Sequence, residues 1–206
     1  VYHLSTTMYP AHRKKMISEI RDRLKKNEKC IVISTSLVEA GVDLDFQSVY
    51  RQLAGVDSII QAAGRCNREG SKPVKESITY IFRFDEREYV PGQRQQINVT
   101  ESLLEDKMNL EELESIELYF EMLYHFRGES LDKKRILNEF KNSNFPFSKV
   151  AKEFRLIEEN TKTILIAREE KAKMILEELQ MKGITKKLKR EMGQYCVNLY
   201  ESDFNK

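Results

Sequence analysis

The chain has 206 residues, of which 40% are hydrophobic and 33% are charged, and these proportions suit a folded globular protein rather than a disordered or fibrous one. A chain of this length accommodates one domain of ordinary size and a smaller second one. Its formal net charge is only +2, which excludes overall charge as the basis of binding, so a nucleic-acid surface would have to come from local clusters of Lys and Arg.

Cysteine, histidine and apolar content restrict the class of protein further. The cysteines at 30, 66 and 196 form no Cys-x-x-Cys pair, and the three histidines lack metal-ligand spacing, so we expect no metal site and a reducing, cytoplasmic location. No run of about 18 apolar residues and no export signal is found, which predicts no membrane partner. Because the chain begins at Val1 inside a strand-like run, we interpret it as part of a longer protein.

Residues 1–92 alternate short β-rich runs with helix-like stretches. Met16, Ile20 and Leu24 recur at four-residue spacing, which predicts a helix over 12–26. The apolar run CIVIST at 30–35 is typical of a parallel strand covered on both faces. Further strands are predicted at 1–5, 48–53 and 77–84, with a short helical stretch at 36–41 and a helix at 57–68. This order favours an α/β fold with a parallel sheet.

After residue 92 the pattern changes to charged amphipathic helices, predicted at 100–126 and 130–141, which we interpret as a helical linker over 93–143. Residues 144–206 follow as a small α+β domain. Strands are predicted there at 155–158 (RLIE), 162–167 (KTILIA) and 195–200 (YCVNLY), with a helix-like run at 168–192. The aromatic residues at 119, 120, 124 and 126 are interpreted as core or interface, and the basic run 182–190 as a solvated helix face or a nucleic-acid contact.

The segment QAAGRCNR at 61–68 carries the first candidate chemistry. On a continuous helix Gln61, Arg65 and Arg68 share one face, and two guanidiniums held close together call for an anion opposite them. A phosphate fits, because a guanidinium grips two of its oxygens at once. The alternative is a solvated face on which Arg65 pairs with Glu69.

The second candidate segment, STSLVEAGVDLDF at 34–46, directly follows the apolar strand. In open parallel sheets ligands bind beyond the carboxyl ends of the strands, where the hydroxyls of Thr35 and Ser36 and the carboxylate of Asp43 are expected. Hydroxyls beside backbone N–H groups suit nucleic-acid phosphates. The alternative is that the hydroxyls cap the following helix while Gly41 and Asp43 form a turn.

Together these segments resemble motifs V and VI of superfamily 2 helicases. With the flanking VYR at 49–51 and DSII at 57–60, the chain is similar to the CRISPR-associated helicase of type I interference systems, most specifically over residues 30–70. The resemblance extends more weakly to His3-Leu4-Ser5 with Arg13, which is similar to motif IV, and to the C-terminal residues. It departs from many superfamily 2 members at Ala62, where they carry another Arg.

The resemblance implies a RecA-like second motor lobe over 1–92, in which a parallel sheet is flanked by helices. Arg65 and Arg68 would act as arginine fingers on the γ-phosphate of ATP. Near the nucleotide would lie Gln61, Asp43 and Gly41. The backbone of single-stranded DNA would be contacted by Ser5, Thr35 and Ser36.

The family's function would make the chain part of an ATP-dependent DNA translocase or helicase in CRISPR antiviral interference. The sequence contains no G-x-x-x-x-G-K-[ST] loop and no paired acidic motif for Mg²⁺, so ATP and Mg²⁺ would be held mainly by an N-terminal lobe, and the chain alone is predicted to be inactive. The other implied partners are a nuclease domain and an RNA-guided CRISPR surveillance complex. Two alternatives are another superfamily 2 motor on DNA or RNA, and a non-enzymatic adaptor of RecA-like shape.

Overall fold

The computed structural model describes residues 1–39, 41–85, 92–132, 134–141, 146–154 and 161–204. Contacts between Cα atoms divide the chain into two units. The first unit comprises residues 1–49, 61–80 and 160–206, and the second comprises residues 50–60 and 81–159. Each unit is therefore assembled from segments that are distant in sequence. The predicted boundaries at 92 and 143 remain a separate, untested proposal.

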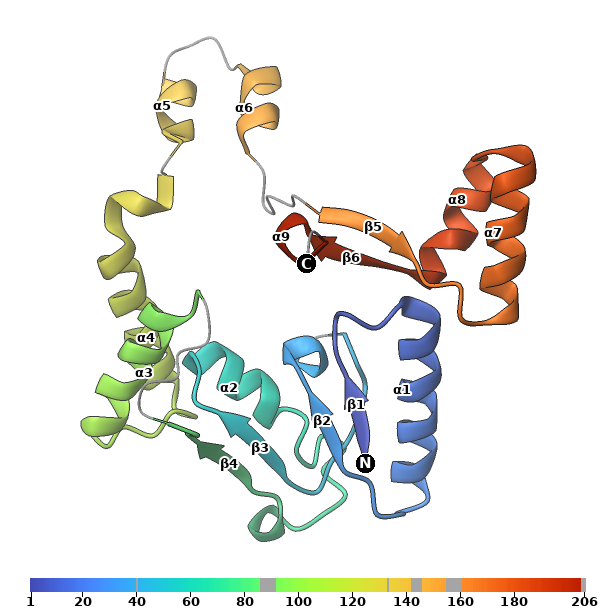
Figure 1. Ribbon diagram of the computed structural model, residues 1–206. Helices are drawn as coiled ribbons and strands as arrows, with labels where there is room; N and C mark the ends of the chain where they lie inside the picture. The colour runs from blue at the N-terminus through green and yellow to red at the C-terminus, as the bar shows by residue number, and fades with distance from the viewer. Residues whose placement is uncertain (40, 86–91, 133, 142–145, 155–160, 205–206) are drawn as a thin grey trace. The chain divides into compact units, whose positions relative to one another are not determined.

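Helices and strands alternate along the first half of the chain, and helices predominate after it (Figure 1). The strands are β1 (Tyr2–Leu4), β2 (Val32–Ser34), β3 (Val49–Gln52), β4 (Thr79–Phe82), β5 (Thr161–Leu165) and β6 (Cys196–Tyr200). The α-helices are α1 (Pro10–Lys25), α2 (Val56–Ala63), α3 (Arg94–Glu105), α4 (Leu113–Arg127), α5 (Ile136–Lys141), α6 (Phe147–Glu153), α7 (Glu170–Lys182), α8 (Lys186–Met192) and α9 (Glu201–Phe204). Short 3₁₀ helices are η1 (Ser36–Val38), η2 (Val74–Glu76), η3 (Gly128–Asp132) and η4 (Gly193–Tyr195).

The first unit begins with a parallel pair, β1 and β2, in which Leu4 lies opposite Ser34. Helix α1 packs on this pair and starts with a proline, whose fixed φ and missing N–H suit a first helical position. Its apolar face is the predicted one, since Ile20 is fully buried against Leu4 and Leu44. Because Leu4 is the last residue of β1, this cluster holds the end of that strand next to the candidate site.

Strands β3 and β4 form a second two-stranded pair, and helix α2 follows β3 directly (Figure 1). The strand arrows point the same way, and the N–H of Val49 donates to the carbonyl of Ile78. Mixed helix and strand content with a parallel pair at β1–β2 agrees with the α/β prediction. A single RecA-like sheet joining all four strands stays a prediction, because the described strands form pairs.

The C-terminal part of the first unit is an antiparallel pair, β5 and β6, packed with helices α7 and α8. It docks on the residue before α1, because Tyr9 is buried among Ala172, Leu188 and Tyr195. The hydroxyl of Tyr9 donates a 2.9 Å hydrogen bond to Oε1 of Glu169. Burial, and then this carboxylate, raise the pKa of Tyr9 above its ordinary value.

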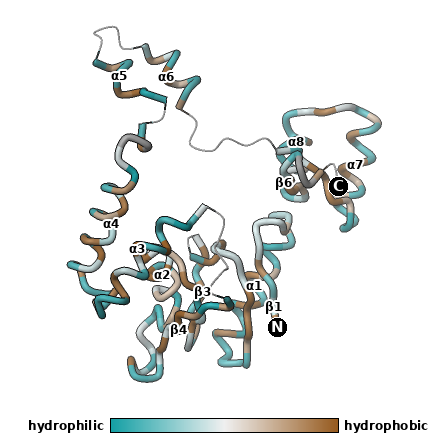
Figure 2. The backbone as a smooth tube through the Cα atoms, turned by 60° about the vertical axis from the view of Figure 1, so that its left-hand side comes forward, coloured by the Kyte–Doolittle hydropathy of each residue, from teal (hydrophilic) through white to brown (hydrophobic). Residues whose placement is uncertain are grey.

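The second unit is built around helices α3 and α4, along which polar and apolar stretches alternate (Figure 2). Tyr119 is fully buried there, so this member of the aromatic run is core, as predicted. Its hydroxyl donates a 2.8 Å hydrogen bond to Oδ1 of Asp57, and burial followed by this bond raises the pKa of Tyr119 strongly. Gly55 leaves room for the pair, since a Cβ on it would lie 2.4 Å from the tyrosine oxygen.

Several predicted helices were wrong in extent. The helix predicted at 100–126 is two helices, α3 and α4, because the chain turns at Asp106 and Lys107, where Lys107 has a φ of 57°. The run 168–192 is divided at Gly183, whose φ of 70° ends α7. In the region predicted as one helix over 130–141, η3 precedes α5. The strand predicted at RLIE lies outside the described residues.

Candidate functional site

The candidate nucleic-acid residues lie where β1 and β2 end. The N–H of Thr35 donates a 3.1 Å hydrogen bond to the carbonyl of Leu4, which extends the parallel pairing beyond the strands. Ser5, the next residue after Leu4, is thereby brought beside Thr35 and Ser36 at one edge of the pair. Segments some 30 positions apart in sequence thus meet because parallel strands end at the same side.

These hydroxyls differ in access to solvent. Thr35 and Ser36 are exposed, whereas Ser5 is only 5% exposed and its Oγ lies 2.8 Å from Oγ1 of Thr7. The exposed Thr7 is a further hydroxyl at this edge that sequence reasoning missed. Its position three residues after the end of β1 is the signal that was available.

Residues 61–68 do not form the continuous helix that was predicted. Helix α2 ends at Ala63, and a turn follows in which the N–H of Cys66 donates to the carbonyl of Ala63. Cys66 then forms a parallel bridge with Phe46, and Asn67 adopts a φ of 49°. Pairing with a distant segment therefore overrides helix continuation, and Gly64 and Asn67 mark the change.

The shared helical face of Gln61, Arg65 and Arg68 is consequently absent. Gln61 is exposed on α2, and the helix ends between it and the two arginines. The alternative pairing of Arg65 with Glu69 along a helix is wrong for the same reason. The two arginines are nevertheless brought next to the 34–46 segment, by contacts that were not predicted.

Arg65 is 8% exposed and points into the loop after η1. Its Nε donates a 2.8 Å hydrogen bond to the carbonyl of Val38, and its Nη2 donates another of 2.8 Å to the carbonyl of Glu39. Its own carbonyl accepts from the N–H of Phe46 at 2.9 Å. Arg65 thus connects the turn after α2 to two parts of the 34–46 segment.

Arg68 is placed differently, with a side chain that is 45% exposed. Its Nε lies 2.9 Å from Oδ1 of Asp43, and its backbone N–H donates a 2.7 Å hydrogen bond to Oδ1 of Asp45. Asp45 was not among the predicted residues, although it follows Asp43 at a two-residue step. Gly41 is exposed with a φ of 75°, in the left-handed region that glycine adopts most readily.

A half-exposed guanidinium opposite a carboxylate can exchange that carboxylate for a phosphate, because both anions offer paired oxygens to the same planar donors. The arrangement of Arg68 and Asp43 therefore fits the phosphate end of a nucleotide. The exposed hydroxyls of Thr35 and Ser36 suit phosphates of a nucleic-acid backbone, whereas that of Ser5 is buried and bonded to Thr7. Among the described residues, no group of three or more His, Cys, Asp and Glu could hold a metal ion.

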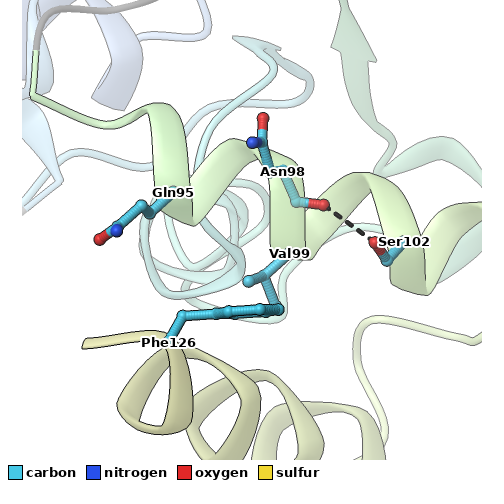
Figure 3. Close-up of a pocket in the computed structure, with 5 residues that line it drawn as sticks. All are labelled: Gln95, Asn98, Val99, Ser102 and Phe126. Atoms are coloured by element: carbon cyan, nitrogen blue, oxygen red, sulfur yellow. Dashed lines mark hydrogen bonds between the residues drawn. The ribbon is translucent and has the colours of Figure 1, made fainter. Parts of the chain in front are cut away.

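A hollow of about 220 Å³ lies in the second unit between α3 and α4, where Phe126 faces Val99 (Figure 3). Its other lining residues are Gln95, Asn98 and Ser102, and Ser102 donates a hydrogen bond to the carbonyl of Asn98. None of the candidate residues lines it. Within the described ranges, no helix has the length and apolar character needed to span a bilayer.

Comparison with known proteins agrees with the sequence resemblance. Residues 1–71 match the family model described as CRISPR-associated nuclease/helicase Cas3, C-terminal. A Cas3 of Haloferax volcanii is 48% identical over 61 residues, which are 29% of this chain and 6% of that protein. A Cas3 of Methanothermobacter thermautotrophicus is 28% identical over 108 residues, 51% of this chain and 13% of that protein.

Among solved structures, that of T. fusca Cas3-ADP superposes with a TM-score of 0.56 and 16% sequence identity, covering 97% of this chain and 29% of that one. At this identity the likeness concerns the fold, and it supports the α/β class. The chain spans a small part of each of these longer relatives. The resemblance to CRISPR-associated helicases is thus confirmed.

Proposed function

We propose, on the premise that this chain is a relative of the C-terminal region of the CRISPR-associated nuclease/helicase Cas3, that it is the second motor lobe of an ATP-dependent single-stranded DNA translocase in CRISPR interference. The observation that carries the proposal is the ion pair between Arg68 and Asp43. It joins the two segments that resemble motifs V and VI. A half-exposed cation held at that junction suits a phosphate site at the surface of the lobe.

The ATP site would be shared with an N-terminal lobe that supplies the phosphate-binding loop and the Mg²⁺ ligands. In this proposal Arg65 and Arg68 provide the positive charge of the second half of the site, with Gln61, Asp43 and Gly41 near the nucleotide. Positive charge placed next to the transferring phosphoryl group stabilises the negative charge of the transition state. This chain alone would lack the phosphate-binding loop, so it would not hydrolyse ATP by itself.

The DNA path would run over the edge formed by Ser5, Thr35 and Ser36. The exposed hydroxyls of Thr35 and Ser36 support this assignment, because hydroxyls and backbone N–H groups hold phosphates without reading bases. Ser5 would contribute after its hydroxyl leaves Thr7. Beyond the motor we propose a nuclease domain, on the same or another chain, and an RNA-guided surveillance complex as partners.

Hydrolysis of ATP by the chain alone, and by the chain with a lobe that carries the phosphate-binding loop and single-stranded DNA, tests the proposal. We expect turnover only in the mixture, and loss of that turnover in Arg68→Ala. A matched control is Arg168→Ala, which removes an exposed arginine between β5 and α7, outside the candidate segments and outside the basic run 182–190. Normal turnover by Arg68→Ala would remove the arginine-finger assignment.

Two alternatives give different outcomes in the same assay. A motor of another superfamily 2 branch would be stimulated more by RNA than by DNA of equal length. A non-enzymatic adaptor would leave the mixture silent although the lobes associate in a pull-down. The similarity to nuclease/helicase proteins favours the DNA motor over both.

A further inference from the structure

The two arginines of the 61–68 segment have different surroundings, and this difference indicates that their roles differ. Arg68 is half-exposed and its guanidinium faces a carboxylate that is itself 73% exposed. Arg65 is 8% exposed, and two of its guanidinium nitrogens donate to successive carbonyls, those of Val38 and Glu39. Only Arg68 is therefore oriented toward a ligand that would arrive from solvent.

The carbonyls that Arg65 holds belong to the end of the short helix η1. That helix closes with a hydrogen bond from the N–H of Glu39 to the carbonyl of Ser36, so the carbonyls of Val38 and Glu39 lie beyond its last turn. Carbonyls at such an end need donors from outside the helix. The planar fork of Arg65 supplies both donors at once.

Arg65 also holds the chain on its other side, because its carbonyl accepts from Phe46. One residue thus links the turn after α2, the bridge residue Phe46 and the end of η1. Three-residue 3₁₀ helices have poor hydrogen-bond geometry and depend on their surroundings. The position of Ser36, the first residue of η1, therefore depends on the guanidinium of Arg65.

We infer that Arg65 is a positioning residue that couples the nucleic-acid edge to the ATP site, and that Arg68 alone provides the arginine finger. The inference rests on the proposed function and refines it. Moving Arg65 onto a phosphate would break two charge-assisted hydrogen bonds and release the loop that carries Thr35 and Ser36. Moving Arg68 breaks one partly exposed ion pair.

The test is ATP turnover of the motor, with the N-terminal lobe present, as a function of single-stranded DNA concentration. For Arg65→Ala we expect the half-saturating DNA concentration to rise about tenfold or more, with turnover at saturating DNA within about fivefold of wild type. For Arg68→Ala we expect turnover to fall about 10³-fold at every DNA concentration, with half-saturation unchanged. Arg65→Lys, which keeps the charge and reaches a single carbonyl, should lie between wild type and Arg65→Ala in half-saturation.

Two results would overturn the inference. In one, Arg65→Ala loses turnover at saturating DNA as Arg68→Ala does while half-saturation stays that of wild type, which is the behaviour of a second finger. In the other, neither Arg65 variant changes half-saturation. If Arg65→Ala does not fold, judged by its circular dichroism, Arg65→Lys decides between these outcomes. A wild-type motor without DNA-stimulated turnover contradicts the proposed function itself, which is a separate result.

Discussion

Nε of Arg68 lies 2.9 Å from Oδ1 of Asp43, and this ion pair bridges two segments separated in sequence by β3 and α2. The pair is partly exposed on both sides, so its direct contribution to stability is small, about 0 to 1 kcal/mol. Its significance is positional, because it keeps a guanidinium at the surface where an anion can replace the carboxylate. That separation of function from stability makes the first prediction testable.

Arg68→Ala is expected to lower ATP turnover of the assembled motor by about 10³-fold or more while leaving the fold intact. The reason is that the guanidinium would contact the transferring phosphoryl group, whereas it is half-exposed and contributes little to packing. Asp43→Asn breaks the same ion pair but keeps the guanidinium, so it should reduce turnover less. Turnover assays with melting curves of both variants check this, and equal losses of turnover would contradict it.

Gly55→Ala is expected to destabilise the second unit by about 1 to 3 kcal/mol, because the new methyl group would overlap a packed interior. Its Cβ would lie 2.4 Å from the hydroxyl of Tyr119 and 2.5 Å from Oδ1 of Asp57. Gly193→Ala is the matched control, since a Cβ there meets nothing within 4 Å. Urea unfolding measures the stability of both variants. Equal free energies of unfolding would show that Tyr119 and Asp57 move aside for the methyl group without loss of stability.

Tyr119→Phe is expected to lower the free energy of unfolding by about 1 to 3 kcal/mol near neutral pH, since it removes a buried hydrogen bond to a carboxylate. The pKa of Tyr119 is raised in the folded state, so its contribution is full below the unfolded pKa of about 10 and is lost as pH rises further. Wild type should therefore lose more stability than Tyr119→Phe between pH 8 and pH 10.5. The exposed Tyr124→Phe is the control and should follow wild type.

Tyr9→Ala is expected to detach the β5–β6 segment and its helices from α1, because it removes the ring at the centre of their shared cluster. Loss of a buried aromatic side chain of this kind costs about 3 to 5 kcal/mol. Hydrogen exchange should rise in peptides of α8 and at the start of α1. Tyr9→Phe keeps the ring and removes only the bond to Glu169, so it should cause a much smaller rise. Unchanged exchange in Tyr9→Ala would show that other contacts hold the segment.

Local patterns predicted those parts of the fold that local contacts determine. The face of α1 with Ile20 follows from four-residue spacing, and a parallel strand at β2 follows from an apolar β-branched run, and the structure has both. The expectation that β2 is covered on both faces was wrong, because Ile33 is 62% exposed. The end of α2 was missed because it is set by the bridge between Phe46 and Cys66, which no local periodicity records. Gly64 was the one sequence signal for this helix end, because glycine commonly follows the last residue of a helix.

In the candidate site, too, the features set by contacts between distant segments could not be predicted. Residue types and the resemblance identified Arg65, Arg68 and Asp43 as candidates. The structure pairs Arg68 with Asp43 and bonds Arg65 to the carbonyls of Val38 and Glu39 in the same 34–46 segment. The prediction that the arginines share one helical face was wrong, and no sequence pattern indicated that Arg65 is buried. Its partners are backbone carbonyls, and carbonyls have no sequence signature, so their role becomes visible only when the chain is folded.

The discontinuity of the first unit has a consequence for how the chain acquires its structure. Tyr9 and Glu169, which close this unit, are 160 positions apart in sequence. On a ribosome the N-terminal strands and α1 would emerge long before the residues that cover Tyr9, and the ring would stay in water until then. Contacts between such distant positions slow folding because a long loop must close first. We therefore expect the docking of β5, β6 and their helices to be a late folding event.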